Sequence, residues 1–274
     1  MTCTIVYTDL DGTLLDHDTY RFDPAKETLA RLKQQGVPVI LCSSKTRAEI
    51  EVLRAEMAVE DPFICENGGA VFIPGGTAGF EQAPGLKEKD RFWVKELGTP
   101  YDVLTEAFQR TKAAGAFDMV GFCEMTTAEI ARLTGLSVEA ARLAARREYS
   151  EPFICRETEE GRRRLEAMFR RQGLQVTQGG RFFHLTGNND KGRAVAYLNR
   201  VYAQGAGGGG EMVTIGLGDS ANDFPMLREV DKPVIIRKKT GQWEPFDYRG
   251  EVYFSRESGP KGWAEAIAAL CFAL

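Results

Sequence analysis

Two aspartates separated by one residue follow the first apolar segment of the chain. The segment covers residues 4–8, and Asp9-Leu10-Asp11-Gly12-Thr13 comes directly after it. Residues two apart lie on the same side of an extended chain, so both carboxylates face the same way. Adjacent carboxylates repel each other unless a cation neutralises them or one carries a proton for acid chemistry. The pattern therefore favours a metal site or acid–base chemistry, with a plain Asp-Gly turn as the alternative.

A second acidic cluster follows another apolar segment, residues 212–217. Its sequence is Gly218-Asp219-Ser220-Ala221-Asn222-Asp223. If a helix begins here, Asp219 and Asp223 lie four residues apart on one face, a like-charge pair that destabilises a helix unless a divalent cation binds. Oxygen ligands without histidine or cysteine nearby favour a hard cation such as Mg²⁺ over zinc. A simple helix cap at Asp219 or Ser220 is the alternative.

Two more polar motifs stand where helices are expected to begin. Asp190-Lys191-Gly192 puts a lysine and a glycine into a first helical turn, where both are locally unfavourable, so an anionic group is expected beside Lys191. Ser43-Ser44 offers hydroxyl and backbone N–H groups at a helix start, where a phosphate can bind. An exposed lysine and ordinary helix caps are the alternatives.

A parallel sheet is the scaffold that brings these motifs together. Residues 4–8 and 37–42 read as strands, and residues 23–35 between them read as a helix that ends at Gly36. This order is a βα crossover, which predicts an α/β fold with parallel strands and helices on both faces. Ligands bind such sheets at the carboxyl ends of the strands, where Asp9, Ser43 and Asp219 fall.

The middle of the chain reads differently. It mixes helices and strands, with a capping box from Thr126 to Glu129 and a hairpin of residues 174–178 and 181–186 joined by Gly179-Gly180. We expect a core of residues 1–84 and 187–274, and an inserted α+β domain of residues 85–186.

Composition excludes several classes of protein. The 274 residues are 43% hydrophobic and 27% charged, and 35 basic against 39 acidic residues give a net charge of −4, which argues against nucleic-acid binding. No apolar stretch approaches the roughly 18 residues of a membrane span. The start of the chain lacks a secretory signal, and six scattered cysteines lack metal-site spacing, so a cytoplasmic protein with reduced thiols is expected. A basic stretch, residues 142–181 with ten arginines against six glutamates, suits a small anionic ligand or a solvated helix face.

In chain order, the four motifs resemble those of the haloacid dehalogenase-like (HAD) phosphohydrolases. These motifs are Asp-x-Asp-Gly-Thr, a Ser or Thr ending the second strand, a Lys, and Gly-Asp-x-x-x-Asp. The insertion between Ser43 and Lys191 is similar to the C2 cap of subclass IIB. The resemblance implies a HAD-like Rossmannoid α/β core with an inserted α+β C2-type cap that supplies most substrate contacts.

The resemblance also implies a mechanism. Asp9 would be the nucleophile and form an aspartyl phosphate, while Asp11 would protonate the leaving alkoxide and then activate water. Ser43 and Lys191 would hold the phosphoryl oxygens.

A bound Mg²⁺ belongs to the same resemblance. Asp9, the backbone carbonyl of Asp11 and Asp219 would hold the ion, and Asn222 and Asp223 would orient this shell and Lys191.

Within subclass IIB, short stretches resemble the mannosyl-3-phosphoglycerate phosphatases, among them residues 40–46, 66–68, 178–182 and 259–263. This implies release of phosphate from mannosyl-3-phosphoglycerate, giving mannosylglycerate in compatible-solute metabolism. Such a substrate carries a carboxylate besides its phosphate and needs cations beyond Lys191. The candidate substrate-binding residues are Ser44, Lys45, Asn67, Arg147, Gln178, Gly179, Gly180, Arg181 and His184.

Other activities fit the same motifs. One alternative is a phosphatase of glucosyl-3-phosphoglycerate or of a broader range of sugar phosphates. The glucosyl and mannosyl substrates differ in the stereochemistry of one hydroxyl, which cannot be read from the sequence. A phosphomutase would use the same aspartyl phosphate, and a phosphometabolite-binding protein would keep the fold without turnover. The small-molecule partner is expected to be a phosphorylated glycoside, with no nucleic acid and no membrane, and the oligomeric state is left open.

Overall fold

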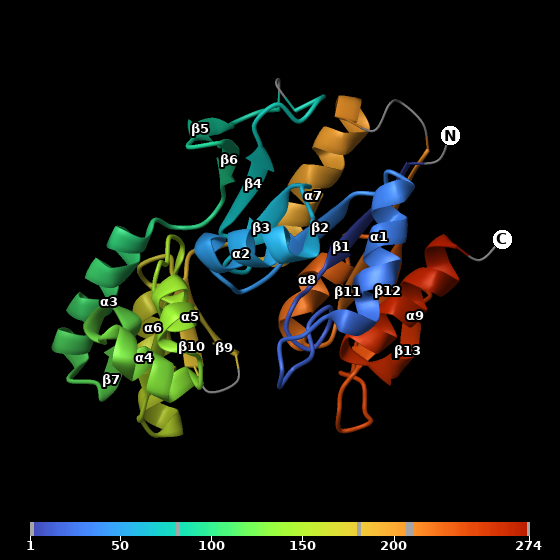
Figure 1. The fold of residues 1–274 in the computed structure, drawn as a ribbon. Helices are drawn as coiled ribbons and strands as arrows, with labels where there is room; N and C mark the ends of the chain where they lie inside the picture. Colours follow the sequence, from blue (N-terminus) through green and yellow to red (C-terminus); the bar gives the residue numbers. More distant parts are fainter. Residues whose placement is uncertain (1–2, 81–82, 180–181, 207–210, 273–274) are drawn as a thin grey trace.

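The computed structural model describes residues 3–80, 83–179, 182–206 and 211–272, which form two lobes (Figure 1). The larger lobe is built on a nine-stranded sheet of order β13-β12-β11-β1-β2-β3-β4-β6-β5, and the smaller on a separate four-stranded sheet of order β7-β8-β10-β9. The fold is therefore the expected α/β core with a second α+β unit.

The larger sheet is parallel from β13 to β3 and antiparallel from β3 through β4 and β6 to β5. In sheet order its strands are β13 (Tyr253–Ser258), β12 (Lys232–Arg237), β11 (Met212–Gly218), β1 (Cys3–Thr8), β2 (Val39–Cys42), β3 (Phe63–Cys65), β4 (Ala70–Pro74), β6 (Phe92–Glu96) and β5 (Lys87–Lys89).

Helices cover both faces of this sheet, as parallel strands require. One face packs against α1 (Lys26–Gln34), α2 (Arg47–Met57) and α9 (Gly259–Cys271). The other face packs against α7 (Lys191–Val201) and α8 (Phe224–Leu227). Alternate residues of β1 serve the two faces, because Val6 belongs to the first apolar cluster and Ile5 and Tyr7 belong to the second.

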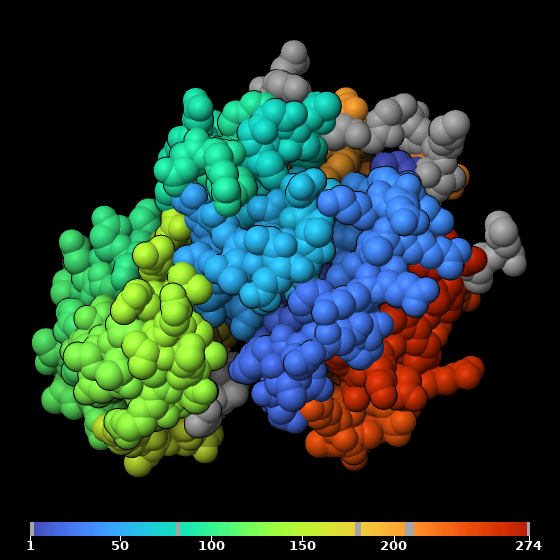
Figure 2. Space-filling model, in the orientation of Figure 1, coloured from blue at the N-terminus to red at the C-terminus, as the bar shows by residue number. Residues whose placement is uncertain are grey.

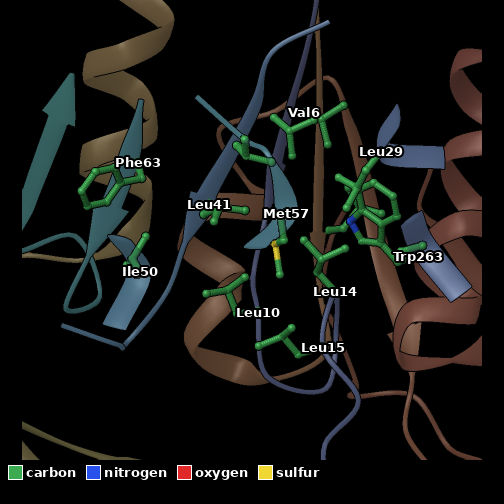
Figure 3. Packing of buried hydrophobic residues seen from close by; sticks show 14 of the residues in the cluster. Val6, Leu10, Leu14, Leu15, Leu29, Leu41, Ile50, Met57, Phe63 and Trp263 are labelled. Atoms are coloured by element: carbon green, nitrogen blue, oxygen red, sulfur yellow. The ribbon is translucent and has the colours of Figure 1, made fainter. Parts of the chain in front are cut away.

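The first apolar cluster also fixes the end of β1. Figure 3 shows Leu10, Leu14 and Leu15, from the loop after β1, packed among residues of the sheet and helices. Trp263 of α9 is fully buried there, and its indole N–H donates to the Thr8 hydroxyl at 3.0 Å. That hydroxyl donates to the carbonyl of Asp9 at 2.7 Å, so the core holds the backbone at the first predicted site residue.

The smaller lobe is an antiparallel sheet with helices packed against it. Its strands are β7 (Met119–Gly121), β8 (Ser150–Cys155), β10 (Phe182–Thr186) and β9 (Gln175–Gly179), and its helices are α3 (Tyr101–Gly115), α4 (Thr127–Thr134), α5 (Val138–Ala144) and α6 (Glu159–Arg170). Phe108 of α3 and Phe169 of α6 pack on Phe153 and Leu185 of the sheet. His184, next to Leu185, therefore lies on the opposite face of the sheet.

Two boundaries differ from the expectation. Residues 87–96 are expected in the inserted domain, but β6 pairs with β4 and β5 pairs with β6, so both strands extend the core sheet. All three residues of β5 are charged or polar and exposed, as is common for a protected edge strand, so no apolar pattern announced it. In the hairpin, Gly179 belongs to β9 and pairs with Phe182, so it is not in the turn as expected, and Gly180 lies outside the described residues.

The other expected elements are present with small shifts at their ends. The capping box at Thr126 and Glu129 forms as predicted. All six cysteines are free, with Cys42 and Cys65 buried and Cys123 exposed. Among the described residues, no helix combines the length and apolar character needed to cross a bilayer.

Candidate active site

The adjacency of three strands creates the site. Because β11, β1 and β2 are neighbours in the sheet, their carboxyl ends meet, and the residues that follow them come together. These residues are Asp219, Asp9 and Ser43, and α7 adds Lys191 from the helix layer.

Lys191 forms the electrostatic centre of the site. Its side chain is completely buried, and its Nζ lies 2.6 Å from Oδ1 of Asp9 and 2.6 Å from Oδ1 of Asp223. Burial alone would lower the pKa of Lys191, but the charges of Asp223 and Asp9 outweigh it and raise this pKa, so the ammonium stays charged. The anionic group expected beside Lys191 is therefore this pair of carboxylates.

Three carboxylates surround this single ammonium group. Asp9, Asp219 and Asp223 each offer an oxygen, and these oxygens lie within 4.8 Å of one another. Burial raises the pKa of Asp9 well above its usual value, and the negative charge of Asp223 is the second cause. The same two causes raise the pKa of Asp219 to about 6. The surplus negative charge in an all-oxygen site fits a hard divalent cation.

Close packing brings Asp219 against the first motif. Gly12 has φ +80°, and a Cβ on it would lie 2.6 Å from Oδ2 of Asp219. Only glycine tolerates both this backbone conformation and this approach. The glycine of the Asp-Gly turn is thus required by the neighbouring carboxylate.

Asp223 organises the second acidic cluster by a different route from the one expected. Helix α8 begins only at Phe224, after a 3-10 turn of residues 221–223, so Asp219 and Asp223 do not share a helix face. Instead, Oδ2 of Asp223 accepts hydrogen bonds from the N–H groups of Asp219 and Ser220, at 3.0 and 3.1 Å. Both oxygens of Asp223 thus have protein donors, which suits a residue that orients the loop and Lys191.

Asn222 is also engaged by the protein. Its amide nitrogen donates to Oδ1 of Asn67 at 3.3 Å, and its amide oxygen accepts from the Ser220 hydroxyl at 2.6 Å. These contacts join the second acidic cluster to the turn after β3.

Asp11 has one partnered and one unpartnered oxygen. Its Oδ2 lies 2.9 Å from Nζ of Lys45, whereas its buried Oδ1 has no hydrogen-bond partner among the described residues. Burial would lower the pKa of Lys45, but Asp11 outweighs this and raises it. A buried acceptor without a donor is costly, so Oδ1 is placed to exchange a proton with a group entering the site.

A cleft of about 820 Å³ lies between the two lobes beside Asp9 and Asp11. Figure 2 shows the two lobes in contact side by side. The predicted site residues that line the cleft are Asp9, Asp11, Ser44, Asn67, Gln178, His184, Lys191, Asp219 and Asn222. The core and the smaller lobe therefore both contribute walls.

The remaining predicted residues that the structure describes lie behind or beside these walls. Ser43 is 1% exposed, and its hydroxyl accepts from the N–H of Lys45 at 3.2 Å. The guanidinium of Arg147 donates to the carbonyls of Ser44 and Ala144, at 2.9 and 2.8 Å. Gly179 ends β9. Gly180 and Arg181 lie outside the described residues.

His184 presents a neutral ring to the cleft. Burial, and then the charge of Arg147, lowers its pKa to about 4. At neutral pH the ring can therefore both donate and accept a hydrogen bond.

Some lining residues were not predicted. Arg237, Lys238, Lys239 and Thr240 line the cleft after β12. The sequence carried a signal for them, because Arg237, Lys238 and Lys239 follow the apolar residues 234–236. Such an apolar run is typical of another parallel strand, whose carboxyl end lies at the same edge of the sheet. The burial of Glu66 between the lobes was also missed, since its three partners lie more than 80 residues further along the chain.

Comparison with known proteins agrees with this geometry. Residues 6–81 match the family model described as haloacid dehalogenase-like hydrolase. A glucosyl-3-phosphoglycerate/mannosyl-3-phosphoglycerate phosphatase from Methanococcoides burtonii is 41% identical over 97% of this chain and 96% of its own. A mannosyl-3-phosphoglycerate phosphatase from Pyrococcus horikoshii is 38% identical over 85% of this chain and 90% of its own. A solved HAD subclass IIB sugar phosphatase has the same fold, with a TM-score of 0.61 at 15% identity, covering 97% of this chain and 98% of its own.

The buried ion pairs of Lys191 predict a large loss of stability in Lys191→Met. Removing one partner of a buried pair leaves uncompensated charge and costs roughly 3–5 kcal/mol. Urea unfolding of Lys191→Met should show this loss, whereas Lys239→Met, which breaks exposed ion pairs with Asp16 and Asp18, should unfold close to wild type. Equal stability of Lys191→Met and wild type would contradict the buried network.

The lowered pKa of His184 predicts acid sensitivity. The unfolded chain binds a proton to this ring near pH 6.5 but the folded chain only near pH 4, so stability falls as the pH drops through this range, by at most about 3 kcal/mol. His184→Gln should flatten the stability profile between these pH values. The matched control His17→Gln, at an exposed histidine, should leave the profile as steep as in wild type, and an unchanged profile in His184→Gln would refute the assignment.

Proposed function

Because the chain belongs to the HAD-like hydrolases, in the branch of the glucosyl-3-phosphoglycerate/mannosyl-3-phosphoglycerate phosphatases, we propose that it releases phosphate from mannosyl-3-phosphoglycerate. The observation that carries this proposal is the constellation of Asp9, Lys191 and Asp11 at one end of a cleft between two lobes. Relatives that match nearly the whole chain support the substrate class. The other product, mannosylglycerate, belongs to compatible-solute metabolism, and the cytoplasm is the proposed location.

In the proposed reaction, the first step transfers the phosphoryl group to the protein. A carboxylate oxygen of Asp9 attacks phosphorus, and the bond from phosphorus to the glycerate oxygen breaks. Asp11, in its protonated form, gives its proton to the departing oxygen. Lys191 and the Ser43 hydroxyl stabilise the charge on the phosphoryl oxygens, which is the main requirement of phosphoryl transfer.

The second step regenerates the enzyme. Asp11, now a carboxylate, takes a proton from water, and the resulting hydroxide attacks the phosphorus of the aspartyl phosphate. Inorganic phosphate leaves, and Asp9 is again a carboxylate. The unpartnered Oδ1 of Asp11 is suited to both proton transfers, while Lys45 holds the other oxygen.

The acidic site is proposed to hold Mg²⁺. Asp9, Asp219 and the backbone carbonyl of Asp11 would provide oxygen ligands, with Asp223 and Asn222 orienting them through the contacts described above. When bound, the ion supplies positive charge that offsets carboxylate repulsion and polarises the phosphoryl group.

The smaller lobe is proposed to act as the substrate-specificity cap. Gln178 and His184 line its side of the cleft, opposite Ser44 and Asn67, and can hydrogen-bond the sugar hydroxyls. Lys45 and Arg147 are the proposed cations for the substrate carboxylate, although the described Arg147 contacts are to backbone carbonyls. Gly179, at the end of β9, completes the proposed set together with Gly180 and Arg181, which lie outside the described residues.

Glucosyl-3-phosphoglycerate is the second candidate substrate. The printed name of the Methanococcoides burtonii relative includes both glycosides, which favours activity on both. A neutral, hydrogen-bonding cap wall of Gln178 and His184 is compatible with either sugar.

The proposed substrate class predicts selective phosphate release. With Mg²⁺, phosphate should be released efficiently from mannosyl- and glucosyl-3-phosphoglycerate and at least about tenfold less efficiently from 3-phosphoglycerate and hexose phosphates, since these lack part of the cap contacts. Asp9→Asn, which removes the nucleophile, should give no release and serves as the blank. Preference for hexose phosphates would discard the substrate class while keeping the mechanism, and near-normal activity of Asp9→Asn would overturn the nucleophile.

The proposed metal predicts a cation requirement. A chelator should abolish phosphate release, and added Mg²⁺ should restore it. Asp219→Asn should need a much higher Mg²⁺ concentration for half-maximal rate, because one charged ligand is lost, whereas Asp247→Asn, at an exposed carboxylate, should titrate as wild type. An unchanged Mg²⁺ titration in Asp219→Asn would refute its role as a ligand.

A further inference from the structure

The turn after β3 has an unusual backbone. Glu66, Asn67 and Gly68 all have positive φ, of 49°, 53° and 87°. Two of these residues carry side chains, which disfavour the left-handed region. Strain of this kind persists only where surrounding contacts fix it, and it concentrates at functional sites.

The main chain of this turn is bound to the active-site loop. The N–H of Glu66 donates to the carbonyl of Lys45 at 3.0 Å, and the N–H of Asn67 donates to the carbonyl of Ser43 at 2.9 Å. A Cβ on Gly68 would lie 2.0 Å from the carbonyl oxygen of Asp190, the residue before Lys191. The backbone of the turn therefore lies against the segments that carry Ser43, Lys45 and Lys191.

The same turn contacts both segments that connect the lobes. The carbonyl of Gly69 accepts from the N–H groups of Leu97 and Gly98, at 2.9 and 2.7 Å, where the chain leaves the core sheet. The side-chain amide of Asn189, where the chain returns, donates to the carbonyls of Glu66 and Asn67, both at 3.4 Å.

The Glu66 side chain reaches further, into the smaller lobe. Its Oε1 accepts from the N–H of Glu148 at 2.9 Å, and its Oε2 accepts from the N–H of Tyr149 at 3.1 Å and from the Ser150 hydroxyl at 2.6 Å. These three residues lead into β8. Glu66 is 1% exposed, so this carboxylate is a buried fastening between core and cap.

Resting on the proposed function, we propose that Glu66 is a positioning residue that sets substrate specificity by holding the cap over the active site. The bonds from the turn to the active-site loop use main-chain atoms, whereas the bonds to the cap use the carboxylate. Changing the carboxylate therefore loosens the cap and leaves the arrangement of Ser43 and Lys45 in place. Reactions that depend on cap contacts should suffer, and reactions that need only the core should not.

Other contacts between the lobes do not replace this one. The Thr46 hydroxyl donates to the carbonyl of Leu143 at 3.0 Å, and Arg147 donates to the carbonyl of Ser44. An exposed ion pair joins Lys89 and Glu148, and the Tyr149 hydroxyl donates to Oε1 of Glu96 at 3.0 Å. Each of the three hydrogen bonds is a single contact and the ion pair is solvent-accessible, whereas Glu66 gathers three donors on one buried charged group.

The test compares two substrates in Glu66→Gln, which keeps the shape of the side chain but presents an NH₂ group to one of the cap donors. For mannosyl-3-phosphoglycerate, kcat/KM should fall at least about tenfold, the effect of losing one hydrogen bond to a charged group. For p-nitrophenyl phosphate, a small ester hydrolysed by the core, kcat/KM should stay within about threefold. The selectivity ratio is a readout that general loss of folding does not move.

Two further variants serve as controls. Asp231→Asn makes the same chemical change at a carboxylate that also accepts from a backbone N–H and a hydroxyl, both of Thr214, within the core. It should leave the selectivity ratio at the wild-type value. Ser150→Ala should give a smaller loss of selectivity, and its effect should not add fully to that of Glu66→Gln, because both act on one contact.

Limited proteolysis gives a readout independent of activity. Cleavage within residues 97–100 and 187–190 should be faster in Glu66→Gln than in wild type or Asp231→Asn. Equal losses on both substrates, no loss on either, or unchanged cleavage would overturn the proposal. If wild type fails to hydrolyse mannosyl-3-phosphoglycerate, the proposed function fails instead, and the proteolysis still decides whether Glu66 fastens the cap.

Discussion

The pairing of one buried ammonium with clustered carboxylates governs this molecule. Lys191 has no access to water, and within the part of the chain that the structure describes its ion-pair partners are Asp9 and Asp223, both at 2.6 Å. A third carboxylate, Asp219, makes the cluster more negative than one lysine can balance. The site therefore favours cations and phosphoryl groups bound together, because each offsets the charge that the other leaves. The strand order β11-β1-β2 and the position of helix α7 bring Lys191 and the carboxylates together.

The role proposed for the second lobe is to add selectivity to a charge centre that by itself binds phosphoryl groups. Polar residues of the lobe's strands β9 and β10 line the cleft. The hydrogen bonds of Glu66 hold this lobe in place relative to the core. Because the turn of Glu66 also contacts the segments bearing Ser43 and Lys191, the orientation of the cap and the geometry of the core share one strained element. In such an arrangement one fold can serve different substrates, because the core can stay the same while the cap and its contacts with the core vary.

Much of the fold and the centre of the site could be predicted from the sequence, because motif residues follow apolar strands and helix ends carry caps. Strand β2 ends at Cys42, as the apolar pattern predicts, and helix α4 begins at the predicted capping box of Thr126 and Glu129. The edge strand β5 could not be predicted, because its charged residues carry no periodic apolar signal. The role of Glu66 depends on partners more than 80 residues away, which only the tertiary structure brings into contact. The hydrogen bonds from the N–H groups of Asp219 and Ser220 to Asp223 were missed for a local reason. A helix was considered from Asp219 onward, whereas residues 221–223 form a 3-10 turn.

In the proposed mechanism Asp9 carries the phosphoryl group between the two steps. To detect this intermediate, the protein is mixed with mannosyl-3-phosphoglycerate and Mg²⁺ and quenched in acid, and covalent phosphate is located by peptide mass spectrometry. Asp11→Asn with p-nitrophenyl phosphate should help this measurement, because that leaving group departs without a proton while the variant slows attack by water on the intermediate. Phosphate is expected on the peptide that contains Asp9, at that residue. Phosphate on another residue, or turnover with no protein-bound phosphate at any quench time, would show that Asp9 is not the nucleophile.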